Sequence, residues 1–338
     1  MLPQHHVDGN GRRAVRGAPP ARGEGRHGAR QRLRRAGTRP RARLLRDEPR
    51  EDRRGGRTHR ALRWASVTAT DTTSTSTGWL ERFERSLHAG DPLGASDTLR
   101  KSGVNGWVRK DHYDLAVKVI DRIDPAPRVR LDWAERLLAH PRRVDKELAG
   151  LVLWPLARTH SREVTRIGYR LARDDDWAVR ETAAALLGQV LTETWADTIP
   201  LLREWVSGPD SRLRRAVVVA AKYAARTRTP EWAEPLLDLI EPALRDREEY
   251  VRKSLGPFAI GDQFVRSYPD ATLARLRKWM HDPDENVRWN VAMALSAASG
   301  ARLGQKAPEI LEFLATDDRP FVRGAVRAAQ RRIRTLVA

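Results

Sequence analysis

Five arginines recur at a nearly constant interval through the C-terminal half of the chain. Each directly follows a valine or leucine at the start of an apolar, mostly alanine-rich stretch, and an acidic turn precedes it. The five are Arg180, Arg214, Arg252, Arg288 and Arg323, with spacings of 34, 38, 36 and 35 residues. Guanidinium groups repeated in this way suit two kinds of chemistry. They can form an ion-pair ladder with turn aspartates of adjacent repeats, or they can line one surface and bind a phosphate backbone.

The ladder is the more general expectation, because stacked repeats need contacts with their neighbours. The turn aspartates that would take part are Asp174, Asp176, Asp210, Asp246, Asp282 and Asp317. The two interpretations can hold for different arginines, so both stay open. Near the C-terminus lies a further basic group, Arg327, Arg331, Arg332 and Arg334. It predicts either the solvated face of a capping helix or the end of a nucleic-acid-binding stripe.

Motifs of several familiar catalytic sites are absent from the sequence. It has no HExxH, no P-loop, no GxSxG and no GxGxxG after a strand. It also has no cysteine, which excludes a disulfide scaffold, thiol catalysis and cysteine-ligated zinc or iron–sulfur sites. The run Asp174-Asp175-Asp176 has no His or Glu at ligand spacing, and is typical of a helix-capping turn. We therefore expect no metal and no cofactor.

The repeated phrase also predicts the fold. Each unit combines a first helix, such as residues 195–206 or 271–281, with an Asp/Pro/Gly turn and a second helix that contains the marker arginine. Lys146 lies one period of 34 residues before Arg180, in a degenerate earlier copy. A period in the mid-thirties with two helices per unit is typical of a helical solenoid. The prediction is all-α: a right-handed α-solenoid of HEAT-like repeats over residues 79–338.

The N-terminal segment 1–78 differs in composition from the rest. Residues 1–66 contain 19 Lys and Arg against 6 Asp and Glu, a net +13, whereas the remainder of the chain is only +6. This Arg/Gly/Pro-rich extension cannot bury a core, so we expect it to be disordered. It is an arginine-rich nucleic-acid tail, an inert extension, or the product of a start codon assigned too far upstream, with the true start near Val67.

No apolar run reaches the roughly 18 residues of a membrane span, and we expect a soluble, cytoplasmic monomer.

Residues 103–333 resemble the AlkC/AlkD superfamily of HEAT-like-repeat alkylpurine DNA glycosylases. The passages that carry the resemblance are LRRAVVVAAKY (213–223) and EEYVRKSLGPFAIGDQFVRSYPDATLARLRKW (248–279). The resemblance implies a solenoid that cradles duplex DNA on a basic concave face and excises N3- and N7-alkylpurines without flipping the base into a pocket. It also implies aromatic contacts to the nucleotide backbone and a carboxylate that stabilises the oxocarbenium-like sugar. Such a mechanism is physically plausible, because a cationic purine is already a good leaving group.

The family's motif Trp-Asp-x-x-Asp, in which the second Asp is catalytic, matches this chain only in part. Its counterpart starts at Trp195, where Ala196 stands for the aromatic residue, Asp197 for the noncatalytic Asp and Pro200 for the catalytic one. A shifted alignment makes Asp197 the candidate carboxylate, with Trp195 and Trp177 nearby.

Two further positions carry over. The family's later aromatic residue is replaced by Pro257, with Phe258 adjacent, and Arg215 matches the family's DNA-contacting arginine. If the carboxylate lies elsewhere, Glu181 and Asp262 are the candidates.

The sequence thus favours a DNA-binding protein of the alkylation-repair type that excises alkylpurines if a catalytic carboxylate is present. The predicted contacts to duplex DNA are Arg214, Arg215, Arg252, Lys253, Arg288, Trp195 and Trp177. The alternative is a HEAT-repeat scaffold without chemistry, which binds another protein on its concave face. The modest charge of the folded part and the absence of the catalytic Asp motivate this alternative.

Overall fold

The described part of the chain is built of helices joined by short turns. The computed structural model describes residues 77–104 and 107–337, which lie in the compact unit Leu62–Ala338. Within them the β-type pairing consists of an isolated bridge between Val104 and Trp107. The predicted N-terminal extension up to residue 76 lies outside the described residues. None of the described helices is long and apolar enough to cross a membrane.

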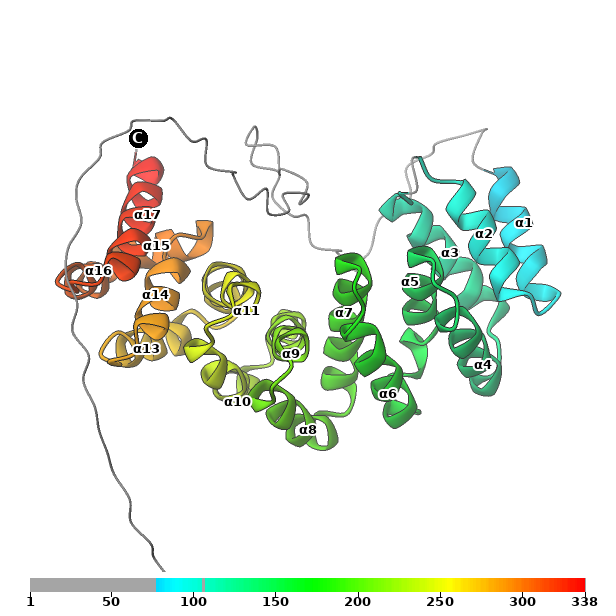
Figure 1. Cartoon of the computed structure of the whole chain (residues 1–338), viewed down its shortest axis with the longest axis horizontal. Coiled ribbons are helices and arrows are strands. Elements are labelled where there is room, and N and C mark those ends of the chain that lie inside the picture. The colour runs from blue at the N-terminus through cyan, green and yellow to red at the C-terminus, as the bar shows by residue number, and fades with distance from the viewer. Residues whose placement is uncertain (1–76, 105–106, 338) are drawn as a thin grey trace, which may run out of the picture. The chain divides into compact units, whose positions relative to one another are not determined.

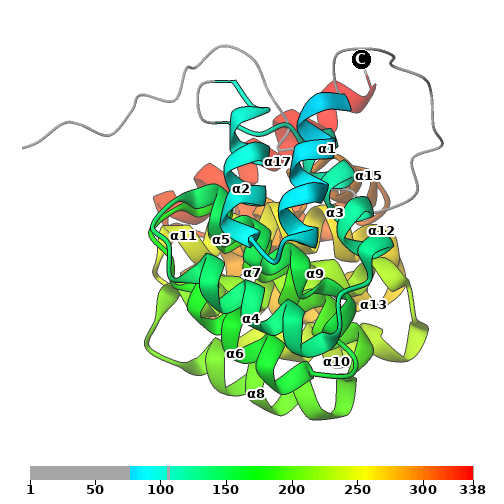
Figure 2. The same cartoon turned by 90° about the vertical axis from the view of Figure 1, so that its right-hand side faces the viewer.

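From α4 onward the helices alternate between two layers, as the repeats predict (Figures 1 and 2). The first helices of the pairs are α4 (Pro127–Leu138), α6 (Ser161–Ala172), α8 (Trp195–Ser207), α10 (Ala233–Ile240), α13 (Pro269–Trp279) and α16 (Pro308–Ala315). The second helices are α5 (Arg143–Val152), α7 (Trp177–Glu193), α9 (Ser211–Ala224), α11 (Glu249–Ser254), α14 (Glu285–Ala294) and α17 (Pro320–Val337). Before the pairs come α1 (Thr77–His88), α2 (Pro92–Lys101) and α3 (Lys110–Ile123), while α12 (Val265–Ser267) and α15 (Ala298–Lys306) are short connecting helices. The all-α solenoid is therefore confirmed.

The second helices stack side by side into one layer. α7 packs between α5 and α9, α9 packs on α11, and α14 packs on α17. A hydrophobic core runs through the described repeats, and it includes the buried side chains of Trp133, Trp205 and Trp279. A separate small cluster of Ala184, Ala185, Val219 and Tyr223, with Trp154 packed against it, lies on the other side of α7 and α9. The side of the second-helix layer that faces away from the first helices is called the inner face below.

Aspartates in the turns cap the N-termini of second helices, as their positions in the sequence predict. The side chains of Asp176, Asp210 and Asp284 accept hydrogen bonds of 2.7 to 2.9 Å from the backbone N–H groups two residues later. Each of these caps satisfies an otherwise unpaired helical donor and contributes about 1 kcal/mol.

The ion-pair ladder is confirmed for part of the arginine series. Arg214 donates to both carboxylate oxygens of Asp246 in the next repeat, at 2.6 and 3.2 Å, and also to the carbonyls of Gly208 and Pro209. Arg288 donates one hydrogen bond to Asp317 in the next repeat, at 2.8 Å, and another to the Asp282 carbonyl. Lys146, in the degenerate copy, bonds to Asp174.

Two other members of the series take different partners. Arg180 donates to Tyr250 and to the carbonyls of Asp174 and Asp175, whereas Arg252 donates to Asn286. The ladder is therefore interrupted at these two repeats, where the inner face carries aromatic side chains.

A π-helix, Leu255–Phe264, continues α11 and packs against α14. Its glycines permit the close approach: a Cβ on Gly261 would lie 2.1 Å from the Ala294 carbonyl oxygen, and one on Gly256 would lie 2.9 Å from that of Asn290. The wider turn brings Phe258 over Lys222 of α9. π-Helical segments are rare overall, and many of those that occur lie at functional sites.

Candidate nucleic-acid interface

A cluster around Arg215 links three adjacent second helices on the inner face. Arg215 of α9 donates to Glu181 of α7 at 2.9 Å and to the Ser254 hydroxyl of α11 at 3.0 Å. Its guanidinium carbon lies 4.9 Å from the centre of the Tyr250 ring. The Tyr223 hydroxyl donates to the other oxygen of Glu181 at 3.0 Å. We call these five residues the Arg215 cluster.

The Arg215 cluster is rigidly arranged and partly shielded from solvent. The side chains of Arg215 and Glu181 are 13% and 17% exposed. Burial and the neighbouring Glu181 raise the pKa of Tyr223, so its hydroxyl keeps the proton that it donates. One donor of the cluster is left over: Nη1 of Arg215 is buried and has no hydrogen-bond partner within the described residues. Since a buried donor without a partner is costly, this nitrogen is suited to bind an external acceptor.

A second arginine–aromatic cluster lies two repeats further along. Trp289 of α14 stacks on Phe321 of α17, with ring centres 5.4 Å apart and an interplanar angle of 6°. The guanidinium carbon of Arg252 lies 5.7 Å from the Trp289 ring and 5.0 Å from the Phe321 ring. Nε of Arg252 is also buried without a partner within the described residues. We call these three residues the Arg252 cluster.

Aromatic residues also gather at the start of α7. Trp107 and Trp177 lie with ring centres 6.1 Å apart, and each is about half exposed, at 52% and 51%. Arg143 of α5 lies over the Trp107 ring at 3.8 Å. Trp177 precedes Glu181 by one helical turn, so the aromatic pair borders the Arg215 cluster.

Lys222 is a buried amine on the same face of α9 as Arg215. Its side chain is almost fully buried, and Nζ lies 2.8 Å from the centre of the Phe258 ring. Burial lowers the pKa of Lys222 to about 7, an effect that Asp262 opposes and Arg226 reinforces. Asp262 is itself bonded to Arg266 at 3.0 Å, so it does not neutralise Lys222 by direct contact.

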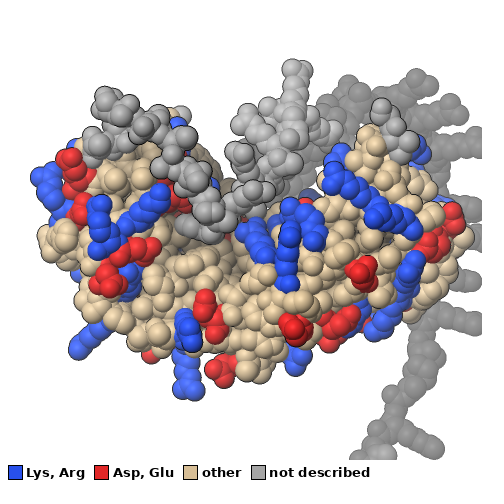
Figure 3. All heavy atoms as spheres, turned by 180° about the vertical axis from the view of Figure 1, so that it is seen from behind, with Lys and Arg blue, Asp and Glu red and all other residues tan. Residues whose placement is uncertain are grey.

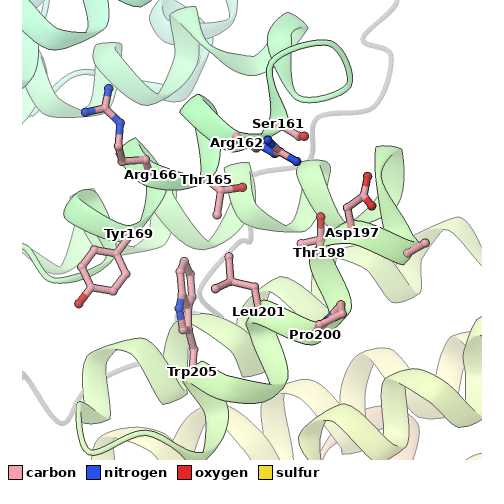
Figure 4. A pocket seen from close by; sticks show the side chains of 11 residues that line it. Ser161, Arg162, Thr165, Arg166, Tyr169, Asp197, Thr198, Pro200, Leu201 and Trp205 are labelled. Atoms are coloured by element: carbon pink, nitrogen blue, oxygen red, sulfur yellow. The ribbon is translucent and has the colours of Figure 1, made fainter.

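The structure places Asp197 apart from this inner face. Asp197 is exposed near the start of α8, a first helix, at the end remote from the turn that leads to Arg215, about 15 Å away along the helix axis. It lines a cavity of about 570 Å³ between α6 and α8, which Arg162, Tyr169 and Trp205 also line (Figure 4).

Its sequence neighbours lie in the same outer region. Pro200 lies inside α8 and lines the cavity as well. Trp195 stacks on Trp232 with ring centres 4.5 Å apart. The structure therefore does not bring Asp197 or Trp195 together with Arg215.

The other predicted contact residues divide into three groups. Arg214 and Arg288 have ladder partners, and Lys253 is exposed and pairs with Glu249 at 2.8 Å. Arg215 and Arg252 lie in the two inner-face clusters. Glu181, an alternative carboxylate in the sequence, lies at the centre of the first. Among the described residues, no group of three or more His, Asp or Glu is arranged to hold a metal ion.

Sequence reasoning missed the aromatic members of the clusters, namely Tyr223, Tyr250, Trp107 and Phe321. A signal for the central pair was present, because Glu181 and Arg215 are 34 residues apart, one repeat, and therefore occupy adjacent positions of stacked helices.

Comparison with known proteins places the Arg215 cluster within a family match. Residues 103–258 match the family described as DNA alkylation repair enzyme, and residues 236–330 match HEAT repeats. No curated protein matches the chain significantly.

Solved structures of helical repeat proteins are also similar to the chain. One is a designed armadillo repeat protein in complex with peptide (KR)4, with 18% identity, 59% of this chain and 98% of that chain covered, and a TM-score of 0.28. Another is a mutant of Kap121p, with 14% identity, 77% of this chain and 29% of that chain covered, and a TM-score of 0.32.

Proposed function

We propose that the chain, a HEAT-repeat protein of which residues 103–258 match the family described as DNA alkylation repair enzyme, binds duplex DNA on its inner face and excises N3- and N7-alkylpurines there. The observation that carries the proposal is the Arg215 cluster: a carboxylate fixed by two donors, beside a buried guanidinium nitrogen that has no partner within the described residues. A phosphate oxygen is the acceptor that such a nitrogen fits. Arg252 offers a second donor of the same kind.

Glu181 is the proposed catalytic carboxylate. In an alkylpurine nucleotide the base carries a positive charge, so the bond from C1′ to the base nitrogen breaks with both electrons going to the base. The base leaves neutral and the positive charge passes to the sugar, where water then adds to C1′ and gives up one proton to solvent. A carboxylate held in place by Arg215 and Tyr223 stabilises this charge without having to reorganise. Trp177 and Tyr250 flank the carboxylate, and their rings are suited to pack against the sugar.

The test compares two carboxyl-to-amide substitutions in the full chain. Glu181→Gln keeps the size of the side chain but removes its charge, and its amide can still accept from Arg215 while it donates to the Tyr223 hydroxyl. We expect it to lower release of 3-methyladenine and 7-methylguanine from methylated duplex DNA by about 100-fold. Asp197→Asn is the matched control and should leave release unchanged, because Asp197 lies on α8 away from the inner face. Loss of release in Asp197→Asn with normal release in Glu181→Gln would transfer the role to Asp197.

A protein-binding scaffold is the alternative that one observation favours. Both signs of charge are interspersed on the surface seen from behind (Figure 3). Charges of opposite sign also pair between described first helices, as Arg275 of α13 does with Asp238 of α10 at 2.5 Å. A surface with mixed charges attracts DNA less than a uniformly basic one does. If the full chain shows no salt-dependent affinity for duplex DNA, the scaffold function is the one that remains.

A further inference from the structure

Helix α17, the last described helix, carries arginines along one side and no acidic residue. Its sequence, PFVRGAVRAAQRRIRTLV, contains five arginines and neither Asp nor Glu. The apolar side packs on α14, α15 and α16 through residues such as Val322, Val326 and Ala329. Arg323, Arg327, Arg331 and Arg334 are exposed. Their spacing of four, four and three residues places them within one side of the helix. We call these four residues the α17 stripe.

The α17 stripe is unpaired, unlike most arginines of the solenoid. None of its four guanidinium groups has an ion pair or side-chain hydrogen bond within the described residues, whereas Arg319 just before it pairs with Asp317. Arg323 shows the contrast most directly. It is the repeat equivalent of Arg214 and Arg288, which bond to an aspartate of the following repeat, but it has no aspartate partner within the described residues.

A solubilising cap alone does not account for this pattern. The outer face of a terminal repeat needs polar side chains, but it does not need charges of a single sign. Like charges three and four residues apart destabilise a helix. At the opposite end of the described solenoid, α1 carries both Glu81 and Arg82 and both Glu84 and Arg85. The single sign of the α17 stripe therefore indicates an anionic partner.

The dimensions of the α17 stripe fit a nucleic-acid backbone. The four arginines extend over about 16 Å of helix axis, at about 1.5 Å per residue. One strand of duplex DNA places a phosphate about every 3.4 Å along its axis, so this length corresponds to about five phosphates. A membrane surface fits less well, because the apolar side of α17 is used in packing and Leu336 is the one large hydrophobic residue exposed on the described helix.

We propose that the α17 stripe is a second phosphate-contact surface, which holds duplex DNA beyond the Arg215 cluster. The Arg252 cluster brings the inner face to α17, since Arg252 of α11 lies over Phe321 in the first turn of that helix, while the α17 stripe lies on another side of it. The proposal rests on the proposed function in that the partner is the same duplex. It adds contacts that bind DNA irrespective of the lesion and independently of Glu181.

The experiment measures the salt dependence of binding to an unmodified duplex by fluorescence anisotropy, with the full chain. Each lost phosphate contact lowers the slope of log K against log salt concentration by about 0.9. We expect Arg327→Gln to lower the slope by about 1 and the fourfold Arg→Gln variant to lower it by about 3 to 4. Arg203→Gln is the matched control, because it removes the same charge from an exposed arginine of α8, a first helix in the outer layer. It should leave the slope unchanged.

Three results would overturn the proposal. If the slope is unchanged in the fourfold variant while the unsubstituted chain binds DNA, the α17 stripe does not contact DNA. The proposed function stays intact in that case. Equal effects of Arg327→Gln and Arg203→Gln show a diffuse charge effect rather than a specific contact surface. Absence of any salt-dependent binding by the unsubstituted chain overturns both this proposal and the proposed function. Circular dichroism melting of each variant checks that the fold is retained.

Discussion

The buried Lys222 should make the stability of the solenoid depend on pH in a way that one substitution removes. Burial lowers its pKa from 10.5 to about 7, so the folded state releases this proton at a lower pH than the unfolded state does. Between these two values the unfolded state binds more protons, and the free energy of unfolding therefore rises as pH rises. The penalty for burying the charged amine is complete below pH 7 and disappears near pH 10.5.

The size of the effect follows from the pKa shift and from Phe258. One pKa unit corresponds to about 1.4 kcal/mol, so the interval from pH 7 to pH 9.5 would add about 3.4 kcal/mol. The ring of Phe258 beside Nζ favours the charged amine by about 1 kcal/mol, which reduces the gain. We expect a net rise of about 2 to 3 kcal/mol over this interval. Tyr113 and Tyr223, whose pKa values burial raises, titrate above it.

The assay is urea unfolding of the full chain and of Lys222→Met at several pH values. Methionine fills a similar volume without a charge, so this variant should be more stable than the unsubstituted chain at pH 7 and should lack the rise of 2 to 3 kcal/mol toward pH 9.5, within about 1 kcal/mol. Lys253→Met is the control, because Lys253 is exposed. The reasoning is refuted if Lys222→Met shows the same pH dependence as the unsubstituted chain, or if it is the less stable of the two at pH 7.

Two further substitutions test the packing of the repeats by urea unfolding. Asp246→Ala removes both hydrogen bonds from Arg214 and the one from the Glu248 backbone, so we expect the free energy of unfolding to fall by about 3 kcal/mol. Asp175→Ala, at a carboxylate that is 96% exposed, should lower it by less than about 1 kcal/mol. Equal losses in the two variants would count against the ladder. Gly261→Ala places a Cβ 2.1 Å from the Ala294 carbonyl oxygen and should cost about 1 to 3 kcal/mol. A Cβ on Gly324 would have its nearest neighbour 4.0 Å away, so Gly324→Ala should be neutral or stabilising by up to about 1 kcal/mol. Similar outcomes at the two glycines would contradict the close packing of the π-helix on α14.

The fold could be predicted from the sequence because it is repeated. Each repeat has the same sequence pattern of a capping aspartate, a marker arginine and an apolar stretch. An interpretation that is correct for one repeat therefore holds for the others. Asp176, Asp210 and Asp284 cap helices as that relation requires. The π-helix was not predictable in this way, because it depends on Gly256 and Gly261 meeting the backbone of α14.

The site was less predictable, because it depends on departures from the repeat. Trp195 and Asp197 are close in sequence to each other and to Pro200, which made them candidates. The structure places both in the outer layer, near Trp232 and Tyr169. Tyr250 could not be connected to Arg180 and Arg215 from its position in the chain, since it joins residues from three helices. Side chains that break the repeat meet only when the repeats are stacked.

One helical step separates the stabilising role of an arginine from its proposed binding role. Arg214 and Arg215 are neighbours, and the turn of about 100° between them directs the first toward Asp246 in the ladder and the second toward Glu181 and Tyr250. The ladder uses every hydrogen-bonding nitrogen of Arg214, whereas Arg215 keeps Nη1 without a partner in the described part of the chain. The position after the marker arginine is therefore one place to look for binding residues in such a solenoid. A marker arginine outside the ladder is another, because Nε of Arg252 also has no partner within the described residues.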